Sequence, residues 1–192
     1  NGAASATGAI NVNVFGVPGV TTGTTGTYTL VSAASGTLNT GTYTLGNIFN
    51  NTNFTVTSVG ATANTITADI ASATALTTAF WKGGIAGATN VWAASNNWTT
   101  TAGGSIQALV PGSGADVTIS ATSPNTAPTA TVLGANMSIN SLTIADTTSG
   151  LGLNADGYAL TISTGGITME ASVPASTIAA PVVLGAAQTW TN

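Results

Sequence analysis

Alternating apolar and polar residues dominate the first third of the chain. The alternation runs through residues 9–17, 26–33, 41–49, 54–60 and 64–71. A period of two places successive side chains on opposite faces of a strand, so each segment is predicted to be a half-buried β-strand. The stretch 71–80 is rich in alanine and threonine and is interpreted as a join between two halves, or as one more strand.

The alternation resumes in the second half of the chain. It runs through residues 115–121, 129–134, 137–145, 158–163, 166–171 and 176–185. Short segments of this kind, rich in Val, Ile and Thr and separated by Gly or Asn turns, favour strands over helices. We therefore expect an all-β protein with almost no helix, divided into a strand-rich segment at 1–80 and a tryptophan-containing segment at 81–192.

Two sequence echoes suggest stacked strands. The pentapeptide Gly-Thr-Tyr-Thr-Leu occurs twice, which predicts equivalent places for Tyr28 and Tyr43 on successive strands. The sequence at 132–140 returns in part at 183–192, a spacing that fits two or three turns of a solenoid with about 20 to 25 residues each. These echoes predict a parallel β-helix or similar solenoid, with the strand-rich N-terminal half stacked on it. A β-sandwich is the alternative.

Composition narrows the class of protein. The 192 residues include one Lys or Arg, five acids, no His and no Cys, and only 3% are charged. An ordinary soluble domain has about a quarter charged residues, so this composition is typical of a secreted or assembled surface. Without His or Cys we expect no metal site, no cofactor and no enzyme activity, since the five carboxylates have no supporting groups.

Charge and hydropathy also bear on partners. The formal net charge of −4 argues against nucleic acid, because a binder neutralises phosphates with several Lys or Arg. The longest apolar stretch, 178–187, is interrupted by proline and is too short to span a bilayer, so no membrane insertion is expected. The location predicted from these features is extracellular.

Residues 80–100 hold the only lysine and three of the four tryptophans. We interpret Trp81, Trp92 and Trp98 as an aromatic plug where one β-unit meets the next, because each can bury about 150 to 250 Å². The alternative is a glycan-stacking platform, to which nearby amide side chains would contribute hydrogen bonds. Those amides belong to Asn96, Asn97 and Gln107. Lys82 also suggests an isopeptide bond to an asparagine, assisted by Asp116 or Glu170.

The same segments resemble a known family. They are 26–56, 80–100, a Pro-Gly turn before 115–121, 132–144, and 176–192 with its Gln-Thr-Trp-Thr pattern, so that the likeness covers nearly the whole chain. Together they are similar to the autotransporter-associated β-strand repeat proteins of bacterial surfaces. In that family the tryptophan segment opens a module and a β-helical stretch ends in the Gln-Thr-Trp-Thr pattern, matched here by Gln188, Thr189, Trp190 and Thr191. The resemblance implies a long, repetitive extracellular protein.

Both ends of the chain have a strand-like pattern. Read end to beginning, Asn192, Asn1 and Gly2 would make an Asn-Asn-Gly turn between two strands. We therefore expect an extracellular structural protein in which units associate head to tail, either in tandem or non-covalently, as a filament or surface layer. The expected assembly residues are Ile10, Val12, Val14, Gln188 and Trp190. The alternative function is a carbohydrate-binding module of a bacterial adhesin, with surface glycans as partners.

Overall fold

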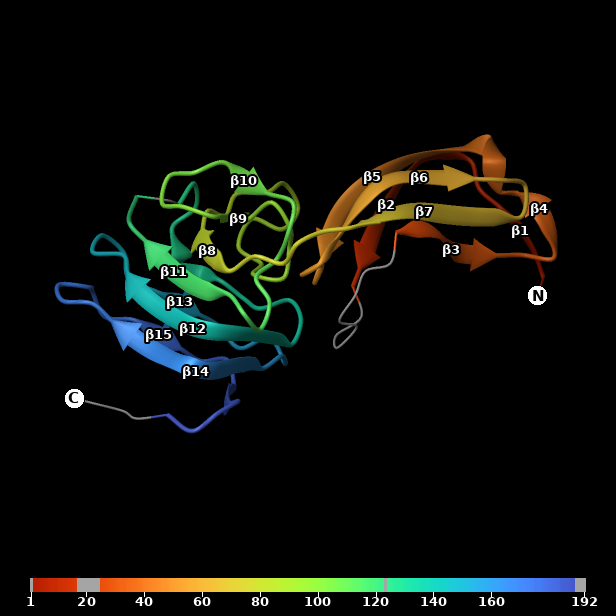
Figure 1. The fold of residues 1–192 in the computed structure, drawn as a ribbon. Helices are drawn as coiled ribbons and strands as arrows, with labels where there is room; N and C mark the ends of the chain where they lie inside the picture. Colours follow the sequence, from red (N-terminus) through yellow and green to blue (C-terminus); the bar gives the residue numbers. More distant parts are fainter. Residues whose placement is uncertain (1, 17–24, 123, 189–192) are drawn as a thin grey trace. The chain divides into compact units, whose positions relative to one another are not determined.

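The computed structural model describes residues 2–16, 25–122 and 124–188 of the chain. This part contains sixteen β-strands and two single-turn 3-10 helices, η1 Leu38–Thr40 and η2 Pro128–Ala130, and no α-helix. The prediction of an all-β protein is confirmed. The chain folds as two compact units (Figure 1). Unit 1 comprises residues 1–48 and 53–74, and unit 2 comprises residues 49–52 and 75–192.

Unit 1 is built from short sheets. Its strands are β1 Ala3–Ser5, β2 Gly8–Phe15, β3 Gly26–Ser32, β4 Ser35–Thr37, β5 Gly41–Phe49, β6 Phe54–Ala61 and β7 Thr65–Ser72. The five strands predicted from alternation match β2, β3, β5, β6 and β7. β7 lies between β3 and β6 in an antiparallel sheet. β1 pairs with β4 in parallel, and β2 pairs with β5.

β2 and β5 run in the same direction. The Thr44 hydroxyl donates to the Ile10 carbonyl oxygen, and the Asn47 N–H donates to Asn13 Oδ1. Both contacts span 34 residues, and a constant offset is characteristic of a parallel pair. Tyr28 and Tyr43 are therefore not on neighbouring strands, because β3 pairs with β7 while β5 pairs with β2.

The core of unit 1 lies between the β2–β5 pair and the sheet of β6 and β7. Its buried members are Val14, Ile48, Val56 and Ala68. Partly buried residues complete it: Val12, Leu45, Phe54, Val59 and Ile70. The alternation accounts for this arrangement, because every second residue of each strand points into the layer between the sheets.

Unit 2 contains one mixed seven-stranded sheet. Its strands are β8 Thr78–Trp81, β9 Trp98–Thr99, β10 Ile106–Gln107, β11 Asp116–Ser120, β12 Met137–Ala145, β14 Leu160–Met169 and β16 Val182–Leu184. The order is β10-β9-β8-β11-β12-β14-β16. β9 and β10 pair antiparallel, whereas all pairs from β8 to β16 are parallel. Residues 80 and 81, between which the sequence-based division was drawn, both belong to β8.

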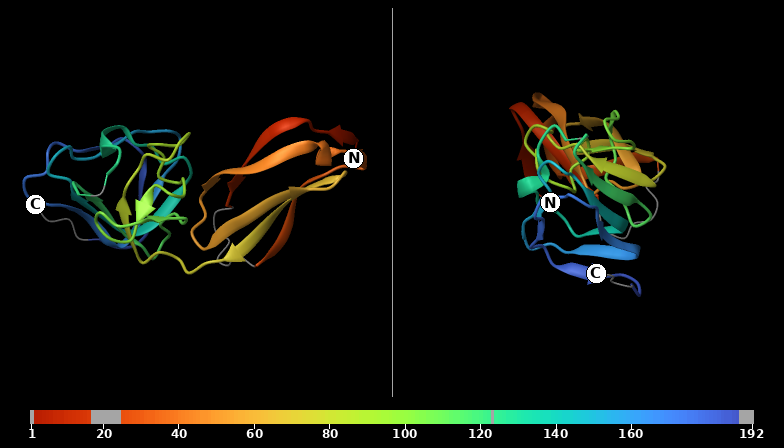
Figure 2. Two further views of the ribbon diagram at one scale, coloured as in Figure 1. Left: turned by 90° about the horizontal axis from the view of Figure 1, so that it is seen from above. Right: turned by 90° about the vertical axis from the view of Figure 1, so that its left-hand side faces the viewer.

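A second, small sheet lies on the connections of unit 2. It consists of β13 Gly152–Leu153 and β15 Thr177–Ile178, paired in parallel. Two isolated parallel bridges, Thr131↔Leu153 and Val91↔Val132, extend this pairing from β13 to earlier segments of unit 2. The chain therefore passes alternately through the large sheet and the small one, from β12 to β13, β14, β15 and β16 (Figure 2).

From β11 onward each pass takes a similar length of chain, whereas the first pass, from Thr78 to Asp116, is longer. The register pairs Leu160↔Val182 and Ser141↔Gly166 are 22 and 25 residues apart. The echo between 132–140 and 183–192 does not follow this period, because Val132 bridges to Val91 while Val183 pairs with Thr161 in the large sheet.

Residues 49–52 belong to unit 2 through a buried asparagine. Asn51 has a relative exposure of 0%, and its Nδ2 donates to the Ala108 carbonyl oxygen at 2.7 Å. The Asn51 carbonyl oxygen in turn accepts the Val110 N–H at 3.2 Å. These contacts fix the segment against the loop that precedes β11.

Candidate functional site

Trp81, Trp92 and Trp98 form a closed cluster in the core of unit 2. Each side chain has a relative exposure of 0%. The ring centroids of Trp81 and Trp92 lie 5.2 and 5.5 Å from that of Trp98, both edge to face, and 6.3 Å from each other. These are favoured separations for aromatic pairs, each worth about 0.5–1.5 kcal/mol beyond burial. The cluster is therefore a main source of packing energy in unit 2.

The glycan-platform alternative does not fit this cluster. A sugar ring stacks on an exposed aromatic face, and none of the three rings has one. Asn97, expected to bind sugar, is itself buried. Its Nδ2 donates to the carbonyl oxygens of Ala88 (2.8 Å) and Val91 (2.9 Å), and its Oδ1 accepts the Ile85 N–H (3.1 Å). Asn97 thus holds the loop that encloses the tryptophans.

Of the other two residues, Asn96 is bonded through its backbone and Gln107 through its side-chain amide. The Asn96 N–H donates to the Gln107 carbonyl oxygen at 3.0 Å, with Asn96 at a φ of 66°. Gln107 Nε2 donates to the Ser105 carbonyl oxygen at 3.0 Å. Asn96 thus bonds the segment before β9 to β10, and the Gln107 side chain bonds to the turn that precedes β10.

Lys82 is tied into the structure through its backbone. Its N–H donates to the Asn97 carbonyl oxygen at 2.8 Å, and its carbonyl oxygen accepts the Asn125 N–H at 2.7 Å. Asp116, one acid suggested to assist an isopeptide bond, instead accepts hydrogen bonds from Asn140 and Ser141. Its carboxylate is engaged on the β11–β12 side of the sheet.

A hydrogen-bonded column of polar side chains crosses the passes of the large sheet. Asn140 Nδ2 donates to Asp116 Oδ1 at 2.8 Å, and Thr164 Oγ1 donates to Asn140 Oδ1 at 3.3 Å. Each of these contacts spans 24 residues. Stacked strands bring equivalent positions together, so one short polar side chain per pass builds a continuous ladder.

Gln188 stands at the end of this column, another 24 residues after Thr164 in the sequence. Its Nε2 donates to the carbonyl oxygens of Ile162 (3.0 Å) and Ser163 (2.8 Å) on β14. The Ile162 carbonyl oxygen also accepts the Gly185 N–H, so the Gln188 side chain continues the bonding to β14 past Leu184, the last residue of β16. Gln188, expected as an assembly residue, therefore caps its own sheet.

Aliphatic side chains form columns on the core side of the same sheet. Ile139 pairs with Ile162, and Ile162 pairs with Leu184. Ile139 and Ile162 have a relative exposure of 0%, whereas Leu184 is 52% exposed. The apolar column thus begins buried and ends in solvent at β16.

β16 is the open end of the sheet. Within the described part of the chain it has one sheet neighbour, β14. All three of its residues are exposed, at 37% for Val182, 47% for Val183 and 52% for Leu184. At the opposite end of the parallel strands, β8 pairs with the antiparallel β9, so among the described strands the parallel series can continue at β16 alone.

The expected N-terminal assembly residues serve their own unit. Val14 is buried and Val12 packs against it in the core of unit 1. Ile10 is half-buried beside Gly41. Trp190, expected at the C-terminal contact, lies outside the described residues. The exposed apolar residues of β16 were not singled out from sequence, although the aliphatic stretch 176–185 contains them.

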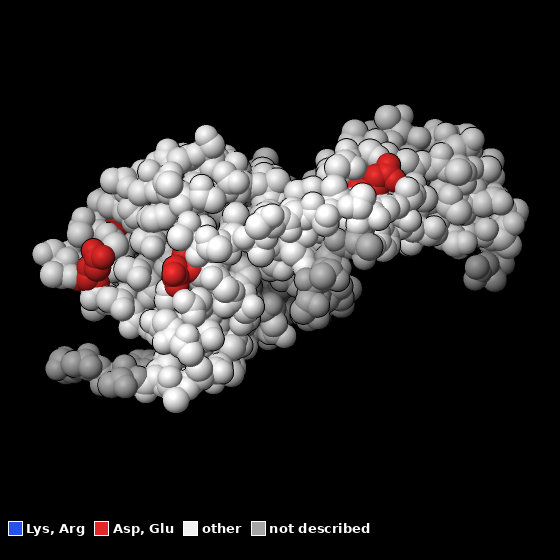
Figure 3. All heavy atoms as spheres, viewed as in Figure 1, with Lys and Arg blue, Asp and Glu red and all other residues white. Residues whose placement is uncertain are grey.

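The surface carries little charge. Figure 3 shows a few acidic side chains scattered over an otherwise uncharged face. Within the described ranges no three acids lie close enough to hold a metal ion. No helix in these ranges is long and apolar enough to cross a membrane. Hydrogen bonds from Ser58 and Thr27 lower the pKa of the Asp69 carboxyl on β7 below its usual value.

Comparison of the chain with protein-family models, with curated proteins and with solved structures finds no match. The polar column of the large sheet and the exposed strand β16 are therefore the features that bear on function.

Proposed function

We propose that this chain is an extracellular structural protein whose units associate head to tail into a filament or surface layer. In this proposal unit 2 is a short β-helical ladder, and its open end at β16 is the contact surface. The observation that carries the proposal is the aliphatic column Ile139–Ile162–Leu184, which is buried at two passes and exposed at the third.

The β-helical interpretation is supported by the path of the chain. From β11 onward parallel strands recur in the large sheet at 22 to 25 residues, and a parallel pair lies on the connections between them. The column of Asp116, Asn140 and Thr164 repeats at 24 residues, as stacked passes require. Such a ladder gains stability from each further pass that covers its end.

Low charge supports association at the open end. Proteins usually block edge strands with lysine or other charges. Residues 176–188 contain no Lys, Arg, Asp or Glu. An uncharged, apolar edge strand without such a block is a template for pairing with another chain.

The resemblance to autotransporter-associated β-strand repeat proteins supports the same reading. It implies a repetitive bacterial surface protein, for which tandem or end-to-end stacking of like modules is the expected organisation. Gln188, which opens the Gln-Thr-Trp-Thr pattern, caps the ladder at the position where a module would end.

Light scattering and negative-stain electron microscopy of the purified full chain over a range of concentrations test the proposal. We expect filaments above a critical concentration. Leu184→Lys should abolish them, because it places a charge on the open strand. Tyr158→Lys is the matched control, since Tyr158 is also exposed but lies outside every strand. A wild-type protein that stays monomeric at every concentration would overturn the proposed function.

A further inference from the structure

We propose that Met169 belongs to the contact surface at the ladder end and is a modification site, where a peroxide converts the thioether to a sulfoxide and thereby weakens assembly. This inference rests on the proposed function, because the effect of the oxidation is measured in the association of ladder ends. The co-reactant is hydrogen peroxide or another hydroperoxide from the surroundings of the protein.

Met169 ends a second apolar column of the large sheet. Ile119 pairs with Ile144, and Ile144 pairs with Met169. Ile119 has a relative exposure of 0% and Ile144 of 3%, whereas Met169 is 60% exposed. This column is thus buried at two passes and open to solvent at the third, as is the column that ends at Leu184.

The side chain of Met169 lies on the core side of the sheet. Directly opposed residues of paired strands point to the same face, and Ile144 is buried in the core. The Glu170 N–H donates to the Ile144 carbonyl oxygen at 2.9 Å, so the bonding to β12 continues past Met169 and fixes the end of β14. Within the described part of the chain, β16 pairs with Leu160–Ile162 and does not reach this end of β14.

Other column ends place Met169 within a larger apolar surface. The half-buried Ile167 pairs with the buried Leu142, and the exposed Val182 pairs with the buried Leu160. Residues 158–169 and 176–188 contain no Lys, Arg, Asp or Glu. We call the residues that end the apolar columns the end surface: Ile167, Met169, Val182 and Leu184.

Methionine supplies the sulfur chemistry of this chain, whose sequence contains two methionines and no cysteine. A lone pair of the thioether sulfur forms a bond to one oxygen of hydrogen peroxide while the O–O bond breaks. The second oxygen takes the proton of the transferred hydroxyl and leaves as water. The sulfur is oxidised and the peroxide is reduced, and a flexible apolar side chain becomes a polar one.

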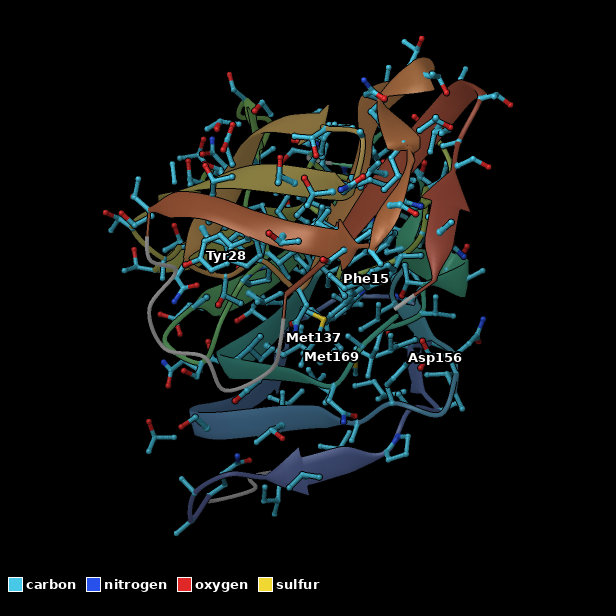
Figure 4. All side chains as sticks on the ribbon, turned by 90° about the vertical axis from the view of Figure 1, so that its right-hand side faces the viewer. Phe15, Tyr28, Met137, Asp156 and Met169 are labelled. Atoms are coloured by element: carbon cyan, nitrogen blue, oxygen red, sulfur yellow. The ribbon has the colours of Figure 1, made fainter. Side chains whose placement is uncertain are left out.

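Met137 is a control within the same sheet. It begins β12, whereas Met169 ends β14, and Figure 4 labels both side chains. Met137 is 4% exposed, against 60% for Met169. A peroxide must reach the sulfur to react, so susceptibility follows exposure. Met169 should therefore be oxidised first.

The sulfoxide should weaken association at the ladder end. A second copy that covers the end surface removes Met169 from water, and burial of the sulfoxide oxygen without a hydrogen-bond donor is unfavourable. The unmodified thioether carries no such cost. Oxidation of Met169 should therefore raise the critical concentration for filaments by about tenfold or more.

Mild treatment of the purified full chain with hydrogen peroxide tests the site. Peptide mass spectrometry of the monomer over time should show Met169 gaining one oxygen at least about tenfold faster than Met137. Light scattering then compares each treated protein with its own untreated sample. The critical concentration should rise for the wild type and for Met137→Leu, and it should not respond to treatment in Met169→Leu. Methionine sulfoxide reductases for both sulfoxide epimers should restore assembly of the wild type.

The outcomes separate this inference from the function on which it rests. Oxidation of Met137 as fast as Met169 would overturn the assignment of Met169 as the reactive site. Oxidised wild type that forms filaments at the untreated critical concentration would overturn the place of Met169 in the contact and leave filament formation intact. A rise that persists in Met169→Leu, or that the reductases do not reverse, would also overturn it. Wild-type protein without filaments before treatment would overturn the proposed function, and with it the effect of oxidation on assembly. Circular dichroism verifies that the oxidised protein and the variants retain the β-sheet fold.

Discussion

Asn140 donates a hydrogen bond from Nδ2 to Asp116 Oδ1 at 2.8 Å, across 24 residues of chain. The same side chain accepts the Thr164 hydroxyl on its Oδ1, again across 24 residues. One amide thus joins three consecutive passes of the unit 2 ladder. It can do so because its donor and acceptor sit on the same planar group and point to opposite neighbours.

Asn140→Ala should destabilise unit 2. It removes the amide that joins the three passes, including a bond to a charged carboxylate, for an expected loss of about 1–3 kcal/mol in the free energy of unfolding. Chemical denaturation followed by tryptophan fluorescence measures this, because all four tryptophans belong to unit 2. Asn154→Ala is the control, since Asn154 is exposed and bonds to Thr131 through its backbone. Equal stability of the two variants would contradict the role of the column.

Trp98→Phe should destabilise unit 2 more than Trp92→Phe, although the two side chains are equally buried. Trp98 Nε1 donates to the Trp92 carbonyl oxygen at 2.8 Å, whereas Trp92 Nε1 is buried without a hydrogen-bond partner in the described structure. Loss of a satisfied buried bond leaves an acceptor unpaired, for a difference of about 1–2 kcal/mol between the variants. Thermal unfolding followed by circular dichroism gives the order. A lower melting temperature for Trp92→Phe than for Trp98→Phe would contradict this prediction.

Gly152→Ala should lower the stability of unit 2, while Gly114→Ala should leave it nearly unchanged. A Cβ on Gly152 would overlap the backbone carbonyl of Thr129, the segment stacked next to β13. A Cβ on Gly114 meets no atom within 4 Å. Overpacking against backbone forces the stacked segments apart, for about 1–3 kcal/mol. Melting temperatures of the two variants test the close approach, and a similar drop in both would count against it.

Asp69 should make unit 1 less stable in acid. Hydrogen bonds from Ser58 and Thr27 depress its pKa in the folded state. Its contribution is therefore present above the ordinary carboxyl pKa of about 3.9 and is lost as pH falls through the folded value. The stability difference between wild type and Asp69→Asn should shrink below this pH, as measured by amide hydrogen exchange in β6 and β7. A difference that grows on acidification would have the wrong sign.

Most strands could be predicted from alternation because each has one face on a core. The strong period of two at 41–49 and 137–145 coincides with β5 and β12 to the residue. Segments 158–163 and 166–171 were expected as two strands but form the single β14, because the irregular register between Ile139 and Ser141 admits extra residues without ending the strand.

The candidate site was harder to predict, since its signal is a spacing and not a motif. Asp116, Asn140, Thr164 and Gln188 recur at 24 residues in the printed sequence, but four different polar residue types hide the repeat. The more obvious echo of Val-Leu-Gly misled, because Val132 forms an isolated bridge with Val91 whereas Val183 lies in the large sheet. Asn97 looked like a sugar ligand because sequence does not reveal burial.

The backbone N–H of Leu184 tests the central claim most directly. It points to the open side of β16, so it should exchange freely with solvent in dilute monomer and be slowed by about 100-fold or more in the assembled state. The neighbouring Gly185 N–H, bonded to Ile162, is the internal control and should be protected in both states. Hydrogen exchange that shows protection of Leu184 on assembly is the result predicted here. Filaments in which Leu184 exchanges as fast as in the monomer, while Gly185 stays protected, would contradict association through β16.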